Sequence, residues 1–200
     1  GAAAGSSTGE AWTYQNEVTY PFGYGLSYTT FEQKLENVEV NLNERTVTAD
    51  VTVKNTGNTA GKDAVQLYVS VPYTDYDREH LVEKSAIQLL DYGKTEELKP
   101  GESTTVTITA DAQDMTSWDS TSKNEAGTEG NYILDAGDYY LTAAKNAHDA
   151  VNNVLAVKGY TKANGMTEDG NTELTFQYNK KELDTKTYSV SSATGEKITN

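Results

Sequence analysis

Acidic residues are the most plentiful groups in this chain that could do chemistry. The sequence holds 30 Asp and Glu against 16 Lys and Arg, two histidines (His80 and His148) and no cysteine. Neither histidine lies in a nucleophile-elbow or metal-helix motif, and the carboxylates gather only in segments rich in turn residues. We therefore expect these carboxylates to be surface groups, and the sequence predicts no catalytic residue.

Two short patterns resemble ligand-binding motifs but fail on inspection. Asp75, Asp77 and Glu79 are spaced like the start of a calcium loop, yet His80 stands where such a loop needs glycine and Ala86 where it needs a bidentate glutamate. We expect a solvated acidic loop there and no metal site. Residues 23–28 place Tyr28 at the third glycine position of a dinucleotide fingerprint, with no strand–helix unit around it, so no cofactor is predicted.

Aromatic side chains are the remaining candidates for contact with a ligand. Tyr73, Tyr76 and Trp118 lie in two long polar segments, residues 73–85 and 114–130. Aromatic rings in long loops can stack on the C–H faces of sugars, or they can pack against a neighbouring domain. The residues alone leave both readings open.

Alternating apolar and polar residues predict the elements that would position these side chains. The clearest run is Val47, Ala49, Val51 and Val53, with polar residues between them. Period two over four to eight residues, bounded by Gly, Pro, Asn and Asp, indicates half-buried strands. We predict about seven of them, at residues 35–42, 46–54, 63–71, 86–93, 103–110, 131–134 and 138–145. Short antiparallel strands in that number favour an all-β sandwich of the immunoglobulin or fibronectin-III kind.

The region after the last of these strands is predicted to differ. Residues 147–157 fit a short helix capped by Asn146. Its apolar face would hold Ala150, Val151, Val154 and Leu155. Residues 158–200 are polar, with weak strands around 174–178 and 187–190.

Charge and composition exclude several classes of partner. A net charge of −14 would repel nucleic-acid phosphates and anionic membranes, so we expect neither as a partner. The absence of cysteine excludes disulfides and thiolate metal sites but does not fix the compartment, so a cytoplasmic and a secreted location both remain open.

A series of motifs over residues 20–145 resembles family 3 glycoside hydrolases, the β-glucosidase group. Tyr20 to Phe31 (YPFGYGLSYTTF) is similar to the segment that joins the catalytic region to a fibronectin-III-like domain in that family. Further matches follow in the expected order, namely VKNTG from Val53, GKDAVQLYV from Gly61, EK at Glu83, LKPGE from Leu98 and AGDYY from Ala136.

This resemblance implies a layout and a role. Residues 1–19 would be a flexible lead-in, 20–34 a strap to the preceding catalytic region, 35–145 the sandwich, and 146–200 a helix and extended linker toward a following domain, as in bacterial members with rearranged domain order. The parent would be a retaining glycosidase that hydrolyses terminal β-linked glucosides with an aspartate nucleophile in its barrel. The motifs for that chemistry are absent from this sequence, so the chain would be a non-catalytic accessory domain that braces the catalytic domains.

The resemblance also suggests which residues face the neighbours. Phe22, Tyr24, Leu26 and Tyr28 would dock against the other domains of the parent, and the loops could shape the active-site mouth or a dimer contact. The alternative is a carbohydrate-binding or surface-adhesive module that holds β-glucan or oligosaccharide with its loop aromatics, Tyr73, Tyr76 and Trp118.

Overall fold

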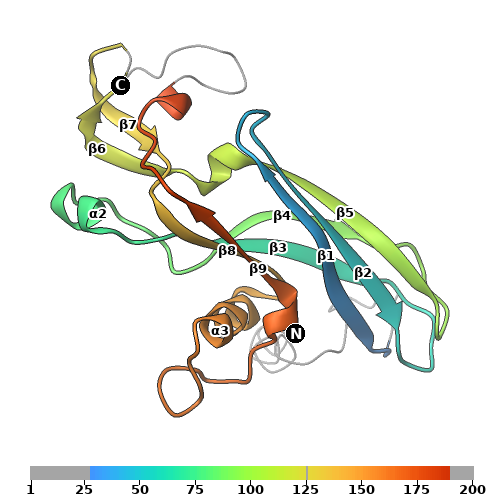
Figure 1. Ribbon diagram of the computed structural model, residues 1–200. Coiled ribbons are helices and arrows are strands. Elements are labelled where there is room, and N and C mark those ends of the chain that lie inside the picture. Colours follow the sequence, from blue (N-terminus) through green and yellow to red (C-terminus); the bar gives the residue numbers. More distant parts are fainter. Residues whose placement is uncertain (1–27, 125, 190–200) are drawn as a thin grey trace, which may run out of the picture.

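The computed structural model describes residues 28–124 and 126–189, and these residues form an antiparallel β-sandwich (Figure 1). The predicted all-β class is therefore confirmed. All seven predicted strands have a counterpart in the structure, and the weak strand predicted around residues 174–178 is present as β9 (Thr175–Lys180). One further strand, β6 (Ser117–Lys123), was not predicted.

One layer is a three-stranded sheet in the order β1–β2–β5, formed by Phe31–Asn41, Thr46–Asn55 and Ser103–Asp111. Val47, Ala49, Val51 and Val53 of the central strand are fully buried, whereas the residues between them are more exposed. The alternation in the sequence thus reports which face of this sheet meets the core.

The other layer is a four-stranded sheet in the order β4–β3–β8–β9, formed by Gln88–Lys94, Ala64–Ser70, Gly137–Ala144 and Thr175–Lys180. Its inward residues, among them Leu67, Tyr139 and Leu141, join the valines of the first sheet in a single hydrophobic core. Strand β9 lies in the segment that we expected to run on as an extended linker, and it pairs with β8 from Gly137 to Thr142. The sandwich therefore continues past residue 145 to Lys180.

Two of the expected loops contain regular structure. The segment 114–130 includes β6 (Ser117–Lys123), which pairs with β7 (Glu129–Ile133) as a separate two-stranded hairpin. The segment 73–85 includes a single helical turn, α2 (Asp75–Glu79), capped at its start by Thr74. At residues 187–189 the structure has a 3₁₀ turn where a weak strand was expected, so that expectation is wrong.

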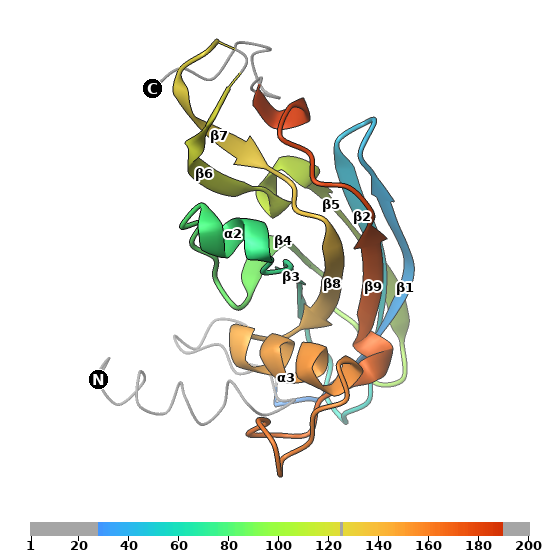
Figure 2. The ribbon, with the colours of Figure 1, turned by 60° about the vertical axis from the view of Figure 1, so that its left-hand side comes forward.

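Helix α3 (Ala147–Val157) confirms the predicted helix, including its cap, because the Asn146 side chain accepts a hydrogen bond from the Asp149 N–H. Figure 2 shows α2 and α3 on the side of the four-stranded sheet that faces away from the three-stranded sheet. Ala150 of α3 packs there against Tyr68 and Ala144. Among the described residues, no helix is both long and apolar enough to span a membrane.

Candidate functional site

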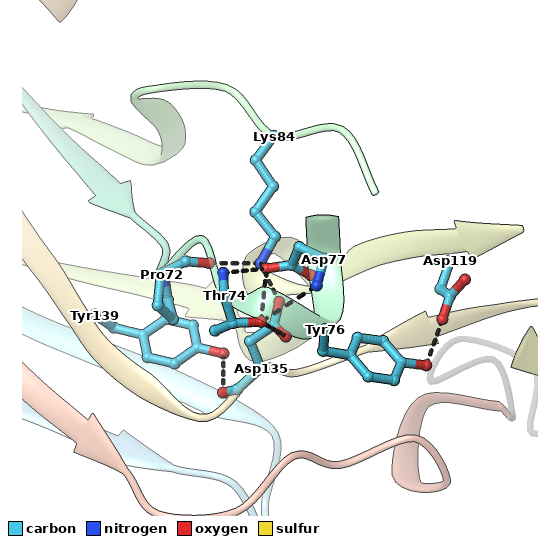
Figure 3. Close-up of polar contacts among 8 residues, drawn as sticks. All are labelled: Pro72, Thr74, Tyr76, Asp77, Lys84, Asp119, Asp135 and Tyr139. Atoms are coloured by element: carbon cyan, nitrogen blue, oxygen red, sulfur yellow. Dashed lines mark hydrogen bonds and ion pairs between the residues drawn. The ribbon is translucent and has the colours of Figure 1, made fainter. Parts of the chain in front are cut away.

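Lys84 lies at the centre of a buried charge cluster that holds the 73–85 segment in place (Figure 3). Its Nζ is 3.0 Å from Oδ2 of Asp77, donates to Oδ2 of Asp135, and donates to the Pro72 carbonyl at 2.6 Å. The side chains of all three charged residues are at most 5% exposed. The cluster ties α2 to the short link between β7 and β8.

Asp77 was expected on a solvated acidic loop, and the structure corrects this expectation for that residue. Asp75 is exposed, but Asp77 is fully buried and its Oδ2 also accepts the Thr74 N–H at 2.8 Å. The helical turn rotates alternate carboxylates to opposite sides, so one faces water and the other faces Lys84. A loop of uniform exposure would not separate them in this way.

The cluster carries two carboxylates for one ammonium group, and this imbalance shifts a pKa. Burial raises the pKa of Asp135 to about 6, and the neighbouring Asp77 adds to the rise, although Lys84 opposes it. Burying a charge without a partner costs free energy, so protonation of one of the two carboxylates lowers the electrostatic cost of burying the cluster. Oδ1 of Asp77 is buried without a hydrogen-bond partner, so the cluster has fewer hydrogen-bond donors than its carboxylate oxygens could accept.

Tyr76 connects α2 to the β6–β7 hairpin. Its hydroxyl donates to Oδ2 of Asp119 at 2.5 Å, and its ring stacks on His80 with 3.8 Å between the ring centroids. The same Asp119 accepts hydrogen bonds from the N–H and the hydroxyl of Thr121. Burial alone would raise the pKa of Asp119, but the hydrogen bonds from Tyr76 and Thr121 outweigh burial and hold that pKa below its usual range.

The other two loop aromatics remain accessible. Tyr73 is 56% exposed, and Trp118, which lies on β6, is 37% exposed and makes an edge contact with Tyr132. Tyr73 lines a groove of about 480 Å³ between residues 70–73 and helix α3. Trp118 lines a smaller groove of about 140 Å³ that shares Val71, Lys84 and Ser85 with the first. The structure thus separates Tyr76, whose ring and hydroxyl are engaged, from Tyr73 and Trp118.

Of the residues expected to dock against neighbouring domains, only Tyr28 falls within the part of the chain that the structure describes, where it is 73% exposed. Phe22, Tyr24 and Leu26 lie outside the described residues.

The arrangement offers little for catalysis within residues 28–124 and 126–189. There, no three acidic or histidine side chains gather to hold a metal ion. The two carboxylates that share Lys84, those of Asp77 and Asp135, are at most 2% exposed. A substrate could not reach this pair without opening the fold, so the cluster acts as a structural anchor.

The sandwich is similar to one part of several longer proteins that are named as β-glucosidases. The family model for the fibronectin type III-like domain matches residues 63–147. Beta-glucosidase A of Butyrivibrio fibrisolvens is 35% identical over 148 residues, which cover 68% of this chain and 17% of that protein. A β-glucosidase of Ruminococcus albus is 34% identical over 139 residues, covering 68% of this chain and 13% of that protein.

The sandwich is also similar to part of solved β-glucosidase structures. A β-glucosidase from Paenibacillus barengoltzii matches with a TM-score of 0.53 at 25% identity, over 87% of this chain and 17% of that one. The chain spans less than a fifth of the length of the curated relatives named above.

Proposed function

The chain belongs to the fibronectin type III-like domains of family 3 glycoside hydrolases, and we propose that it is a non-catalytic accessory domain which braces the catalytic domains of a longer enzyme of the β-glucosidase type. The observation that carries this proposal is the use of the buried carboxylates. Asp77 and Asp135 bind Lys84, and Asp119 binds Tyr76; these contacts anchor α2 and the β6–β7 hairpin. The three carboxylates therefore do not line a site open to substrate.

Rigid anchoring is what a bracing domain needs. The Lys84 cluster and the Tyr76–Asp119 bond fix two projecting segments on the sandwich. Surfaces that are ordered before contact lose less entropy when they dock, so their contacts contribute more of their energy to the interface. In this proposal residues 20–34 join the sandwich to a preceding catalytic region through Phe22, Tyr24, Leu26 and Tyr28, and the chain after residue 180 leads toward a following domain.

Calorimetry of the full-length parent beside the 200-residue chain tests the bracing role. A docked sandwich should unfold together with the catalytic domains, in one transition above the melting temperature of the isolated chain. A separate transition in the parent, at the temperature of the isolated chain, would show a sandwich that hangs from the enzyme without bracing it.

A second candidate function is carbohydrate binding, favoured by the accessible rings of Tyr73 and Trp118 in neighbouring grooves. Titration of the chain with soluble β-glucan, and pull-down with insoluble β-glucan, would test it. Binding that is lost in Tyr73→Ala or Trp118→Ala, and retained in Tyr92→Ala as an exposed control, would favour this candidate over bracing alone.

A further inference from the structure

Residues 184–189 fold back onto the β6–β7 hairpin, and we call them the clasp. The clasp begins at a reciprocal backbone bridge, in which the Asp184 N–H donates to the Leu134 carbonyl at 2.8 Å and the Leu134 N–H donates to the Asp184 carbonyl at 2.9 Å. Figure 2 shows the 3₁₀ turn of the clasp, in red, beside β7. The clasp therefore lies against the point where the hairpin joins the sandwich.

Buried polar side chains hold the far end of the clasp to β7. Asn131 of β7 is 0% exposed, and its amide nitrogen donates to the Thr185 carbonyl. The amide oxygen of Asn131 accepts the hydroxyl of Ser189, which is also buried, at 2.8 Å. A buried amide that loses its partners destabilises the fold, so the position of β7 depends on the clasp.

The clasp is also bound to the three-stranded sheet. Arg45, in the turn between β1 and β2, donates from Nη2 to the Thr187 carbonyl at 2.8 Å, and its guanidinium carbon lies 5.1 Å from the centre of the Tyr188 ring. Tyr188 is 1% exposed and belongs to the hydrophobic core between the two sheets. The clasp thus connects the hairpin to the body of the sandwich.

The hairpin needs this connection because, among the described residues, it shares no backbone ladder with either larger sheet. Strands β6 and β7 form a separate two-stranded sheet, and a two-stranded hairpin alone is marginally stable in water. Tyr76 of α2 binds β6 through Asp119, whereas the clasp binds β7 through Asn131. Trp118 of β6 contacts Tyr132 of β7, so the place of Trp118 depends on the position of the hairpin.

The hydroxyl of Tyr188 opposes closure of the clasp. It is buried without a hydrogen-bond partner among the described residues. Burial raises the pKa of this hydroxyl to about 12, so it stays protonated near neutral pH and its donor stays unpaired. In an open clasp the hydroxyl would bond to water. Burial of the ring therefore favours the closed clasp, whereas burial of the hydroxyl favours the open one.

We propose that residues 184–189 are a releasable clasp: when closed it fixes the β6–β7 hairpin, and with it Trp118 at its groove, and its local opening frees the hairpin while the sandwich stays folded. This inference goes beyond the proposed function, because every contact that carries it lies within the described chain. It holds whether the sandwich braces a neighbouring domain or binds carbohydrate. The chain continues past Ser189, so a force applied at that end acts on the clasp before it reaches β9.

Amide hydrogen exchange in the 200-residue chain tests for local opening. Amides of β6 and β7 should exchange faster than those of β2 and with little dependence on urea, because opening of the clasp exposes little surface. Hairpin amides that exchange as slowly as those of β2, with the same urea dependence, would show that the hairpin opens only when the sandwich unfolds. That result would overturn the proposal.

Two substitutions should act on the clasp in opposite directions. Ser189→Ala leaves the buried Oδ1 of Asn131 without its donor, so exchange in the hairpin should become about fivefold faster or more. Tyr188→Phe removes the unpaired hydroxyl, so the same exchange should become about fivefold slower. Lys186→Ala, at an exposed residue of the clasp, is the matched control and should leave the exchange unchanged. Hairpin exchange that Tyr188→Phe does not slow, or that Ser189→Ala does not speed, would contradict the role of the clasp.

Fluorescence of Trp118 gives a second readout at the groove itself. The chain has two tryptophans, so a Trp12→Phe background leaves Trp118 as the sole emitter. Quenching by acrylamide should increase in Ser189→Ala and decrease in Tyr188→Phe, because opening of the clasp releases the ring from Tyr132. Equal quenching in the two variants would refute the link between the clasp and Trp118.

Discussion

Lys84 lies between two carboxylates in a part of the fold closed to solvent. Removing it would leave two like charges without a partner, which is among the most destabilising changes that a buried site can undergo. Removing one carboxylate instead leaves a neutral pair. The charge that remains in the cluster therefore determines how much each substitution lowers the stability of the fold.

Asp135 is expected to make the stability of the chain depend on pH. Its pKa is raised from 3.8 to about 6 in the folded state, so folding favours the protonated form. That contribution to stability is complete below about pH 4 and is lost as the pH rises through 6, by an amount on the order of 2 kcal/mol. In Asp135→Asn this fall should disappear, as measured by urea unfolding between pH 4 and 7.

The comparison needs a control, because other carboxylates titrate in the same range. Asp75→Asn changes an aspartate whose side chain is 89% exposed and should leave the pH profile parallel to that of the unmodified chain. A parallel profile for Asp135→Asn as well would contradict the assignment of the bound proton to the Lys84 cluster.

Tyr76→Phe should lower the stability of the chain by about 1–2 kcal/mol. The substitution keeps the ring stacked on His80 but deprives the buried Asp119 of a hydrogen bond from the hydroxyl. Chemical denaturation would measure the loss. Tyr73→Phe, at a ring that is 56% exposed, is the control and should change stability by less than about 0.5 kcal/mol; equal effects of the two substitutions would argue against the Tyr76–Asp119 bond.

At the scale of elements, the sequence predicts those whose pattern is set by the core. Strand β2 alternates cleanly because one of its faces is buried, and α3 carries both a cap at Asn146 and an apolar face. Strand β6 escapes prediction because Ser117–Lys123 contains a single apolar residue, Trp118, so no period can be read. Helix α2 escapes for a similar reason, since five residues hold barely one turn.

Strand β9 illustrates a different limit. Its pattern around residues 174–178 was visible, but its place beside β8 was not, because α3 and the connection that follows separate the two strands in sequence. The buried side chain of Asn153 supports this connection: it donates to the Ala143 carbonyl on β8 and accepts the N–H of Asn171. Such contacts depend on three-dimensional closure, which local periodicity does not encode.

Gly170→Ala should disturb the docking of β9 on the sandwich. A Cβ at residue 170 would lie 2.1 Å from the carbonyl oxygen of Asn152, so the backbone of the connection must shift away from α3. We expect a loss of about 1–3 kcal/mol in stability and faster amide hydrogen exchange in β9 than in β2. Ala163→Ser, an exposed change in the same connection, should alter neither quantity, and unaffected exchange in Gly170→Ala would mean that this contact does not hold β9 in place.

At the scale of the whole molecule, the candidate site was harder to predict than the fold. Lys84 and Asp135 are 51 residues apart, and Tyr76 and Asp119 are 43 apart. In an acidic chain the carboxylates and the lysine are more simply interpreted as surface groups, and only the tertiary fold brings the 73–85 segment into contact with Asp119 and Asp135. Tyr73 and Trp118 could be selected from the sequence because an aromatic residue within a long polar segment is visible without knowing its contacts in the fold.

Hydrolysis of an aryl β-glucoside by the 200-residue chain, assayed beside the full-length parent, tests the central claim most directly. The account predicts turnover by the parent and none by the chain, because the buried carboxylates of the sandwich are engaged in anchoring its loops. Reproducible turnover by the isolated chain, abolished by substitution of one of its own carboxylates, would contradict the account and place a catalytic site within this domain.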